Sequence, residues 1–169
     1  MKSSRSSANI ILSILIIIVI ISIPVYFIIK NSNKPPVRTN LNCDSSLWGH
    51  VYHKYRLDVI EECKIVTGTI IRIKPEEDGD LHIQLRLDAG QDNLLNDKNY
   101  SVQHGNLTRE PICVDRVSQS DAIGPCSDYI NSVKIPKVGE HVKVTGSYVN
   151  DKEHGWNEIH PVTAIEVIE

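Results

Sequence analysis

Two short polar clusters carry the side chains of this chain that could do chemistry. One is the octapeptide 154–161, which holds two imidazoles and a carboxylate, at His154, Glu158 and His160. The other is the acidic stretch 76–82, which ends in a histidine. Imidazole nitrogens combined with carboxylate oxygens form the ligand sets of zinc and of non-haem iron, and they also suit copper. The two clusters therefore predict a metal or ligand site, provided that the fold brings them together.

The spacing inside each cluster places its polar side chains on a common face. Alternate residues of a β-strand project from the same side, so Glu158 should share a face with His160, and Asp80 should share one with His82. His154 falls in the turn before the last predicted strand and could close over the site. The predicted metal ligands are His82, His154, Glu158 and His160. The predicted ligand-binding residues are Asp78, Asp80, Arg86 and Trp156.

The residues leave the ion open between zinc, copper and calcium. In a catalytic zinc site, Glu158 could act as a general base toward a metal-bound water. Calcium prefers hard oxygen ligands, which the carboxylates of 76–80 supply, although their spacing is not that of an EF-hand loop. The chemistry therefore ranges from simple cation binding to metal-dependent hydrolysis.

A purely structural interpretation explains the same residues. Aspartates around a glycine are common in hairpin turns. Glu158 could pair with Arg86 across the sheet, and His160 could bond to a neighbouring loop. Trp156 could close one end of the core. On this interpretation, the domain is an interaction module and the clusters only hold its loops in place.

Strand patterns dominate the chain beyond residue 63. Several stretches are rich in β-branched residues or alternate between apolar and polar side chains. Gly68 lies inside the first of them and predicts a bulge or a sharp bend. Ser118 resembles the start of a capping box, and Gly124-Pro125 should keep the helix that follows short. The expected strands are 64–74, 80–88, 106–114, 141–149 and 157–168, the expected helix lies within 118–130, and a further short helix covers the first half of 47–60.

Three strands, a short helix and two further strands form the element order of an OB-fold, a five-stranded Greek-key barrel. The predicted fold class is therefore mainly β, an OB-like Greek-key barrel with a short helix between strands 3 and 4, preceded by a transmembrane helix. In an OB-fold, the loops between strands 1 and 2 and between strands 4 and 5 border the ligand-binding face. Here those loops are 75–79 and 150–155, which hold or adjoin the two polar clusters.

The N-terminal part of the chain predicts a membrane anchor. Ile10 to Ile29 is a run of 20 uncharged residues, which as a helix would span roughly 30 Å and cross a bilayer core. A cleaved signal peptide is the alternative, but the run is long for one and no small-residue cleavage site follows it. The expected layout is a tail at 1–9, an anchor at 10–30, a linker at 31–42, a helical or irregular lead-in at 43–62 and the OB-like domain at 63–169.

Cysteine usage predicts that the domain is exported. All four cysteines lie beyond the anchor and none belongs to a Cys-x-x-Cys pair, so a disulfide framework is favoured over a structural zinc site. Four reduced thiols in a cytoplasmic domain are the alternative. We predict the pairs that are nearest in sequence, Cys43–Cys63 and Cys113–Cys126. The expected location is the cell membrane, with a single span and an extracytoplasmic C-terminal domain.

The charge balance disfavours nucleic acid as a partner. From residue 31 onward, the chain carries 15 lysines and arginines against 21 aspartates and glutamates, whereas phosphate binding needs a basic surface. Neither a P-loop nor a Gly-x-Ser-x-Gly nucleophile motif is present. The expected partners are the membrane, through Ile10 to Ile29, and a membrane protein. The functional hypotheses are a binding or accessory module, a nuclease- or phosphoesterase-like metal-dependent hydrolase, and a structural module of a membrane complex.

Three segments, 63–69, 78–82 and 154–161, together resemble a pattern found in uncharacterised exported proteins of archaea and bacteria that carry an HGWNEIHP motif. The resemblance covers roughly 51–168, and the octapeptide is its most specific part. It implies a membrane-anchored OB-like β-barrel in which the two clusters form one site. It implies no reaction and assigns no role to individual residues.

Overall fold

The computed structural model describes residues 43–169. The predicted tail, anchor and linker, 1–42, lie outside the described residues. Within 43–169, no helix is both long enough and apolar enough to cross a membrane. The described part is mainly β, as predicted.

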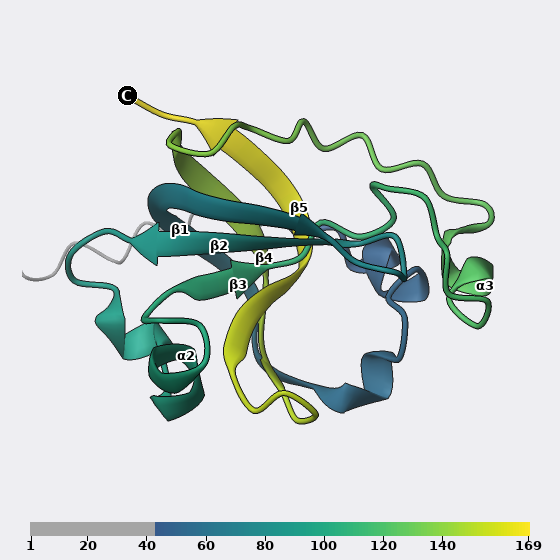
Figure 1. The fold of residues 1–169 in the computed structure, drawn as a ribbon, viewed down its shortest axis with the longest axis horizontal. Helices are drawn as coiled ribbons and strands as arrows, with labels where there is room; N and C mark the ends of the chain where they lie inside the picture. Colours follow the sequence, from purple (N-terminus) through teal and green to yellow (C-terminus); the bar gives the residue numbers. More distant parts are fainter. Residues whose placement is uncertain (1–42) are drawn as a thin grey trace, which may run out of the picture. The chain divides into compact units, whose positions relative to one another are not determined.

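Five strands form a mixed sheet that closes in a ring (Figure 1). Around the ring the order is β1-β2-β3-β5-β4, and β4 pairs back to β1. Every neighbouring pair is antiparallel except β3 and β5, which run parallel. The strands are β1 (Leu57–Pro75), β2 (Leu81–Leu87), β3 (Leu107–Arg109), β4 (His141–Asp151) and β5 (Asn157–Val167).

The first strand serves both halves of the ring. Its first part pairs with β4, its second part pairs with β2, and Gly68 faces Val142 on one side and Leu87 on the other. A Cβ atom on Gly68 would clash with the backbone carbonyl of Arg86. The register shifts of β1 lie elsewhere, between 59 and 64 and between 70 and 72. The glycine predicted to form a bulge is therefore required by the close approach of a neighbouring strand.

Strand β1 also begins earlier than expected. Its start at Leu57 falls inside 43–62, which was expected to be a helical or irregular lead-in. Pairing with β4 extends to the start of the strand, because Leu57 lies opposite Asp151. The rest of the lead-in forms two 3₁₀ turns, η1 (Ser45–Gly49) and η2 (Lys54–Arg56), where a short helix was expected.

The interior of the ring is mainly apolar. Leu81, Ile83 and Leu85 of β2 are buried, which confirms the face predicted from their alternation. They pack with side chains from all four other strands, so that each strand contributes to one core. A second, smaller core lies around η1 and includes Leu47 and Ile112. Burial of one such aliphatic side chain contributes about 1.5–3 kcal/mol to folding.

The segment between β2 and β3, for which no helix or strand was expected, contains helical structure. It forms the 3₁₀ turn η3 (Asp92–Leu94) and the helix α2 (Asp97–Ser101). Asn96 caps α2, because its side chain accepts hydrogen bonds from the backbone N–H groups of Lys98 and Asn99. Capping by asparagine satisfies amides that the first helical turn leaves free.

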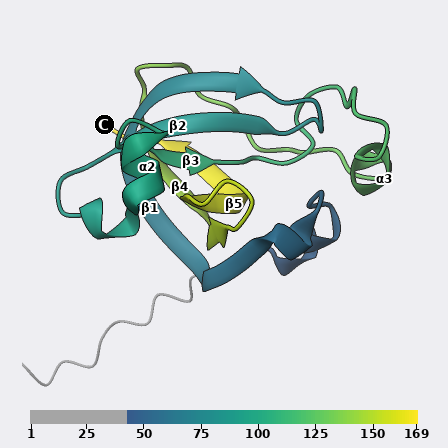
Figure 2. The ribbon, with the colours of Figure 1, turned by 60° about the horizontal axis from the view of Figure 1, so that its bottom comes forward.

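The helix expected within 118–130 is only one turn long. α3 (Ile123–Cys126) begins after Ala122, which makes no side-chain capping bond, so the predicted start at Ser118 is wrong. Gly124 and Pro125 lie inside this turn. α2 and α3 lie at opposite ends of the sheet (Figure 2), and α3 lies between β3 and β4 in the chain, as predicted.

Both predicted disulfides are present. Cys43 is bonded to Cys63, which ties the start of the described segment to β1, and Cys113 is bonded to Cys126, which ties the residues after β3 to α3. The described residues contain no free cysteine. Because disulfides persist in oxidising compartments, this framework indicates an extracytoplasmic location.

Candidate metal centre

The parallel pair β3–β5 brings the end of β3 beside the middle of the octapeptide. Thr108 lies opposite Glu158 and Arg109 lies opposite Ile159. The pairing continues past β3, because the amide of Glu110 donates to the carbonyl of Ile159 at 2.9 Å. The side chain of Glu110 therefore comes next to that of His160.

Glu110 lies between two imidazoles. Its Oε2 atom is 2.9 Å from Nδ1 of His160, and its Oε1 atom is 2.6 Å from Nε2 of His82. On the outer side, Nδ1 of His82 is 3.2 Å from a carboxylate oxygen of Glu76. Glu110 and His160 are at most 1% exposed, whereas His82 reaches the surface. These contacts thus form a continuous row of side chains from a solvent-accessible imidazole, His82, to a fully buried one, His160.

Glu158 completes the buried side of this network. Its Oε1 atom is 3.1 Å from Nδ1 of His160, and its Oε2 atom accepts a 2.8 Å hydrogen bond from the indole Nε1 of Trp156. Glu158 is fully buried. Both carboxylate oxygens are therefore engaged by neighbouring side chains of the octapeptide.

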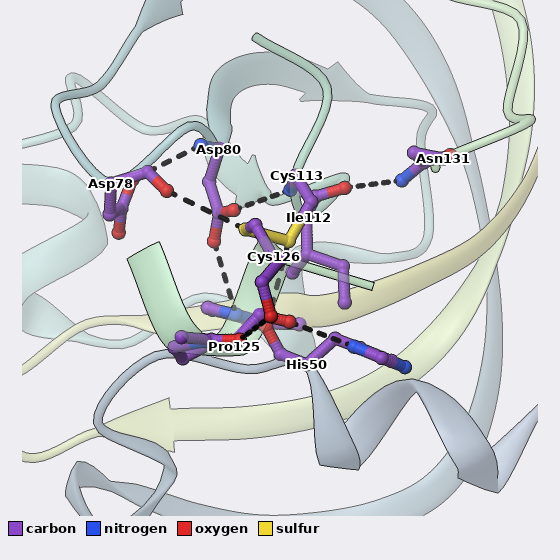
Figure 3. The surroundings of a disulfide bond; sticks show 11 residues. His50, Asp78, Asp80, Ile112, Cys113, Pro125, Cys126 and Asn131 are labelled. Atoms are coloured by element: carbon purple, nitrogen blue, oxygen red, sulfur yellow. Dashed lines mark hydrogen bonds and ion pairs between the residues drawn. A yellow bond between two sulfur atoms is a disulfide. The ribbon is translucent and has the colours of Figure 1, made fainter. Parts of the chain in front are cut away.

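Asp80 reaches the same place from the hairpin between β1 and β2. Its Oδ1 atom accepts a 2.7 Å hydrogen bond from the backbone N–H of Cys113 (Figure 3). Its Oδ2 atom lies 3.9 Å from Nε2 of His160. Asp80 is 2% exposed, and the disulfide of Cys113 and Cys126 lies beside it (Figure 3).

Asp80, Glu110 and His160 form a group that could hold a metal ion. One ligand atom from each lies within 4.8 Å of the other two, and all three residues are buried. Two of them have a buried polar atom without a hydrogen-bond partner among the described residues, namely Asp80 Oδ2 and His160 Nε2, whereas Glu110 Oε1 contacts Nε2 of His82 at 2.6 Å. Buried polar atoms normally have partners, so the unpaired atoms mark a place where a ligand would gain bonds.

Electrostatic interactions favour the charged forms of His160, Glu110 and His82 in this cluster. Burial would lower the pKa of His160, but the carboxylates of Glu110 and Glu158 hold it well above its ordinary value of 6.5. Burial would raise the pKa of Glu110, but His160 and His82 hold it well below 4.5. Burial also opposes protonation of His82, yet Glu110 raises its pKa to about 9.

The pKa values of the two remaining carboxyl groups, Asp80 and Glu158, are raised, whereas that of Glu110 is lowered. Burial raises the pKa of Asp80 from 3.8 to about 7, against the opposing effect of His160. Burial and the charge of Glu110 raise the pKa of Glu158 from 4.5 to about 7. Both groups therefore exchange their protons near neutral pH, where a cation could displace the proton of Asp80.

We expect the metal-free protein to be most stable at weakly acidic pH. Raised folded-state pKa values of Asp80 and Glu158 remove stability as pH rises from about 4 to about 7, because the folded state then holds more protons than the unfolded state. The stability contributed by His82 is complete below its unfolded pKa and is lost as pH rises through about 9. The pKa of Glu110 is lowered in the folded protein, so the stability that this group contributes is present at neutral pH and is lost only at low pH.

Urea unfolding at pH 5, 7 and 9 in the presence of a chelator tests this expectation. The midpoint should fall in that order, and His82→Gln should flatten the decline between pH 7 and 9. A midpoint that rises from pH 5 to pH 9 in the chelated protein would show that these groups do not control its stability.

The structure brings only part of the predicted metal set together. His82 and His160 both contact Glu110, and Glu158 contacts the Nδ1 atom of His160. His154 is engaged elsewhere, because its Nδ1 atom is 2.8 Å from Oδ2 of the buried Asp151.

The predicted ligand-binding residues are placed in three different settings. Asp78 accepts a 3.1 Å hydrogen bond from the amide of Asp80 and so shapes the turn. Trp156 is buried, with its ring stacked on that of His154 at a centroid distance of 4.4 Å. Arg86 is exposed on β2 and forms no ion pair with Glu158 in the described part of the chain.

Sequence reasoning missed Glu110, the residue that joins the two clusters. It also missed the flanking pair of Arg56 and Asp151, in which Nη1 lies 3.2 Å from Oδ2. A signal for Glu110 was available, because the third strand of an OB-fold borders the fifth. A carboxylate in the middle of the predicted strand 106–114 would then face the octapeptide.

No known protein-family model matches this chain, and no curated protein matches it either.

Proposed function

We propose that this protein is a membrane-anchored, extracytoplasmic binding module with an OB-like Greek-key fold, and that Asp80, Glu110 and His160 bind a divalent transition-metal ion. The ring order of the strands, the long β1 shared by both halves of the ring and the helix between β3 and β4 support the OB-like assignment. The two disulfides and the uncharged run from Ile10 to Ile29 support anchoring outside the cytoplasm.

The observation that carries the metal proposal is the buried cluster of Asp80, Glu110 and His160, in which Asp80 Oδ2 and His160 Nε2 have no hydrogen-bond partner among the described residues. Their chemistry, two carboxylates and an imidazole, suits zinc or another first-row ion better than calcium, which prefers oxygen ligands alone. Two ligand atoms around a tetrahedral zinc ion lie about 3.4 Å apart. The 3.9 Å between His160 Nε2 and Asp80 Oδ2 is close to that spacing.

The geometry supports binding more than hydrolysis. A hydrolase of the kind considered from the sequence would use Glu158 as a general base toward a metal-bound water. Glu158 is fully buried, and its two oxygens are held by Trp156 and His160. The proposed ligands are themselves almost completely buried, which is typical of a closed site that lacks an open position for substrate.

Elemental analysis of the purified full-length chain in detergent, after incubation with zinc and removal of free metal, tests the proposal. We expect about one zinc ion per chain in the wild type. Asp80→Asn should lose it, because an amide is a much poorer ligand than a carboxylate. His154→Gln is the matched control and should retain the metal, because His154 pairs with Asp151 outside the cluster.

Two results would overturn the proposal. One is the absence of bound zinc, copper and manganese in the folded wild type. The other is loss of the metal in His154→Gln together with its retention in Asp80→Asn, which would place the ion at the surface of the β4–β5 turn.

A further inference from the structure

A polar cavity opens on the outer side of the sheet, next to the metal cluster. The two share His82, which lines the cavity and contacts Glu110 at 2.6 Å, but none of the three proposed metal ligands lines it. Its volume is about 380 Å³, a size that suits a small organic molecule. Its walls come from β1, β2 and β3, from the residues after α2 and from the turn between β4 and β5. The lining residues used below are Arg72, Lys74, Glu76, Gln84, Thr108 and Trp156.

Hydrogen-bond donors form a row across three neighbouring strands on this face. Arg72 of β1 lies opposite Gln84 of β2, which in turn lies opposite Thr108 of β3. Lys74 lies two residues beyond Arg72 and therefore projects from the same face. The Oγ1 atom of Thr108 is buried and has no hydrogen-bond partner among the described residues. The row presents a guanidinium, an ammonium and a free hydroxyl to one space.

The charge of the cavity is opposite to that of the domain around it. Lys74 is paired with Glu76 at 2.8 Å, whereas Arg72 forms no ion pair with any residue of 43–169. The chain beyond residue 30 is acidic overall. A local cationic cavity on an acidic surface attracts anions specifically to that place.

We propose that this cavity binds small molecules that carry an oxyanion, phosphate or carboxylate, with Arg72 as the principal contact. A guanidinium can donate two parallel hydrogen bonds to either group, and Lys74 adds a point charge. Thr108 donates its hydroxyl proton to a further oxygen. The binding does not require the metal, since none of the three proposed ligands lines the cavity.

Trp156 lines the cavity, so its indole fluorescence can report binding there. The chain contains two tryptophans, so a Trp48→Phe background leaves Trp156 as the only source of indole fluorescence. The full-length chain in detergent is titrated with inorganic phosphate and, separately, with malonate, against sodium chloride of equal ionic strength. Calorimetric titration of the same samples detects binding that does not change the fluorescence.

We expect saturable binding of at least one probe, and a preference between phosphate and malonate identifies the source of the oxyanion. Arg72→Gln should weaken it by at least about tenfold, the loss expected for a bidentate charged contact. Arg86→Gln is the matched control, because Arg86 is also exposed on this hairpin but does not line the cavity.

Two results would overturn the inference. One is the absence of saturable heat and of a saturable fluorescence change for both probes. The other is equal weakening by Arg72→Gln and Arg86→Gln, which would indicate general charge attraction. Neither result bears on the metal proposal, which elemental analysis tests independently.

Discussion

Glu110→Gln lowers the free energy of unfolding of the metal-free protein by about 3–5 kcal/mol, the usual cost of removing one partner from a buried ion pair. The carboxylate is 1% exposed and contacts His160 at 2.9 Å and His82 at 2.6 Å. Glutamine keeps the shape of the side chain but not its charge. Two imidazoles then lose the group that holds their protons, and their pKa values fall.

Urea unfolding at pH 7 in the presence of a chelator measures this effect. Glu166→Gln serves as the control, because it removes a carboxylate from an exposed pair with Lys143 at 2.8 Å. Such surface pairs contribute about 0–1 kcal/mol. A similar, small change in both variants would mean that the buried network contributes no more than an ordinary surface ion pair.

Cys113→Ser/Cys126→Ser lowers the free energy of unfolding by about 2–4 kcal/mol, as expected when a short loop is released from its cross-link. The disulfide closes a sequence separation of 13 residues and holds the segment that follows β3. Local order around Asp80 depends on the same segment, because the amide of Cys113 donates to Asp80 Oδ1 at 2.7 Å. We therefore expect weaker zinc binding as well as lower stability.

Unfolding under oxidising and reducing conditions checks this prediction. The wild type should lose stability when reduced, whereas the double variant retains only the response of Cys43–Cys63. Equal midpoints for the wild type and the variant under oxidising conditions would contradict it. Replacing both cysteines avoids a free thiol, which could itself bind the metal.

Several parts of the fold could be predicted because they depend on neighbouring residues. Leu81, Ile83 and Leu85 alternate with polar residues, and a strand with one buried face requires that period. Helix α2 was harder to predict, because its sequence lacks such a periodic pattern. Asn96 and Asn99 form a capping box in a polar segment without helical periodicity, so α2 was not predicted from the pattern of apolar residues.

Residue types and spacing alone determined that the chain holds strands in the order needed for a closed sheet, four cysteines suited to two short-range disulfides, and two polar clusters. The tertiary structure decided which residues of those clusters meet. His154 and His160 belong to one octapeptide, yet one pairs with Asp151 and the other with Glu110. Strand register sets that difference, because the parallel pairing of β3 with β5 joins residues about fifty positions apart. Local patterns specify which face a side chain takes, whereas long-range pairing specifies its partner.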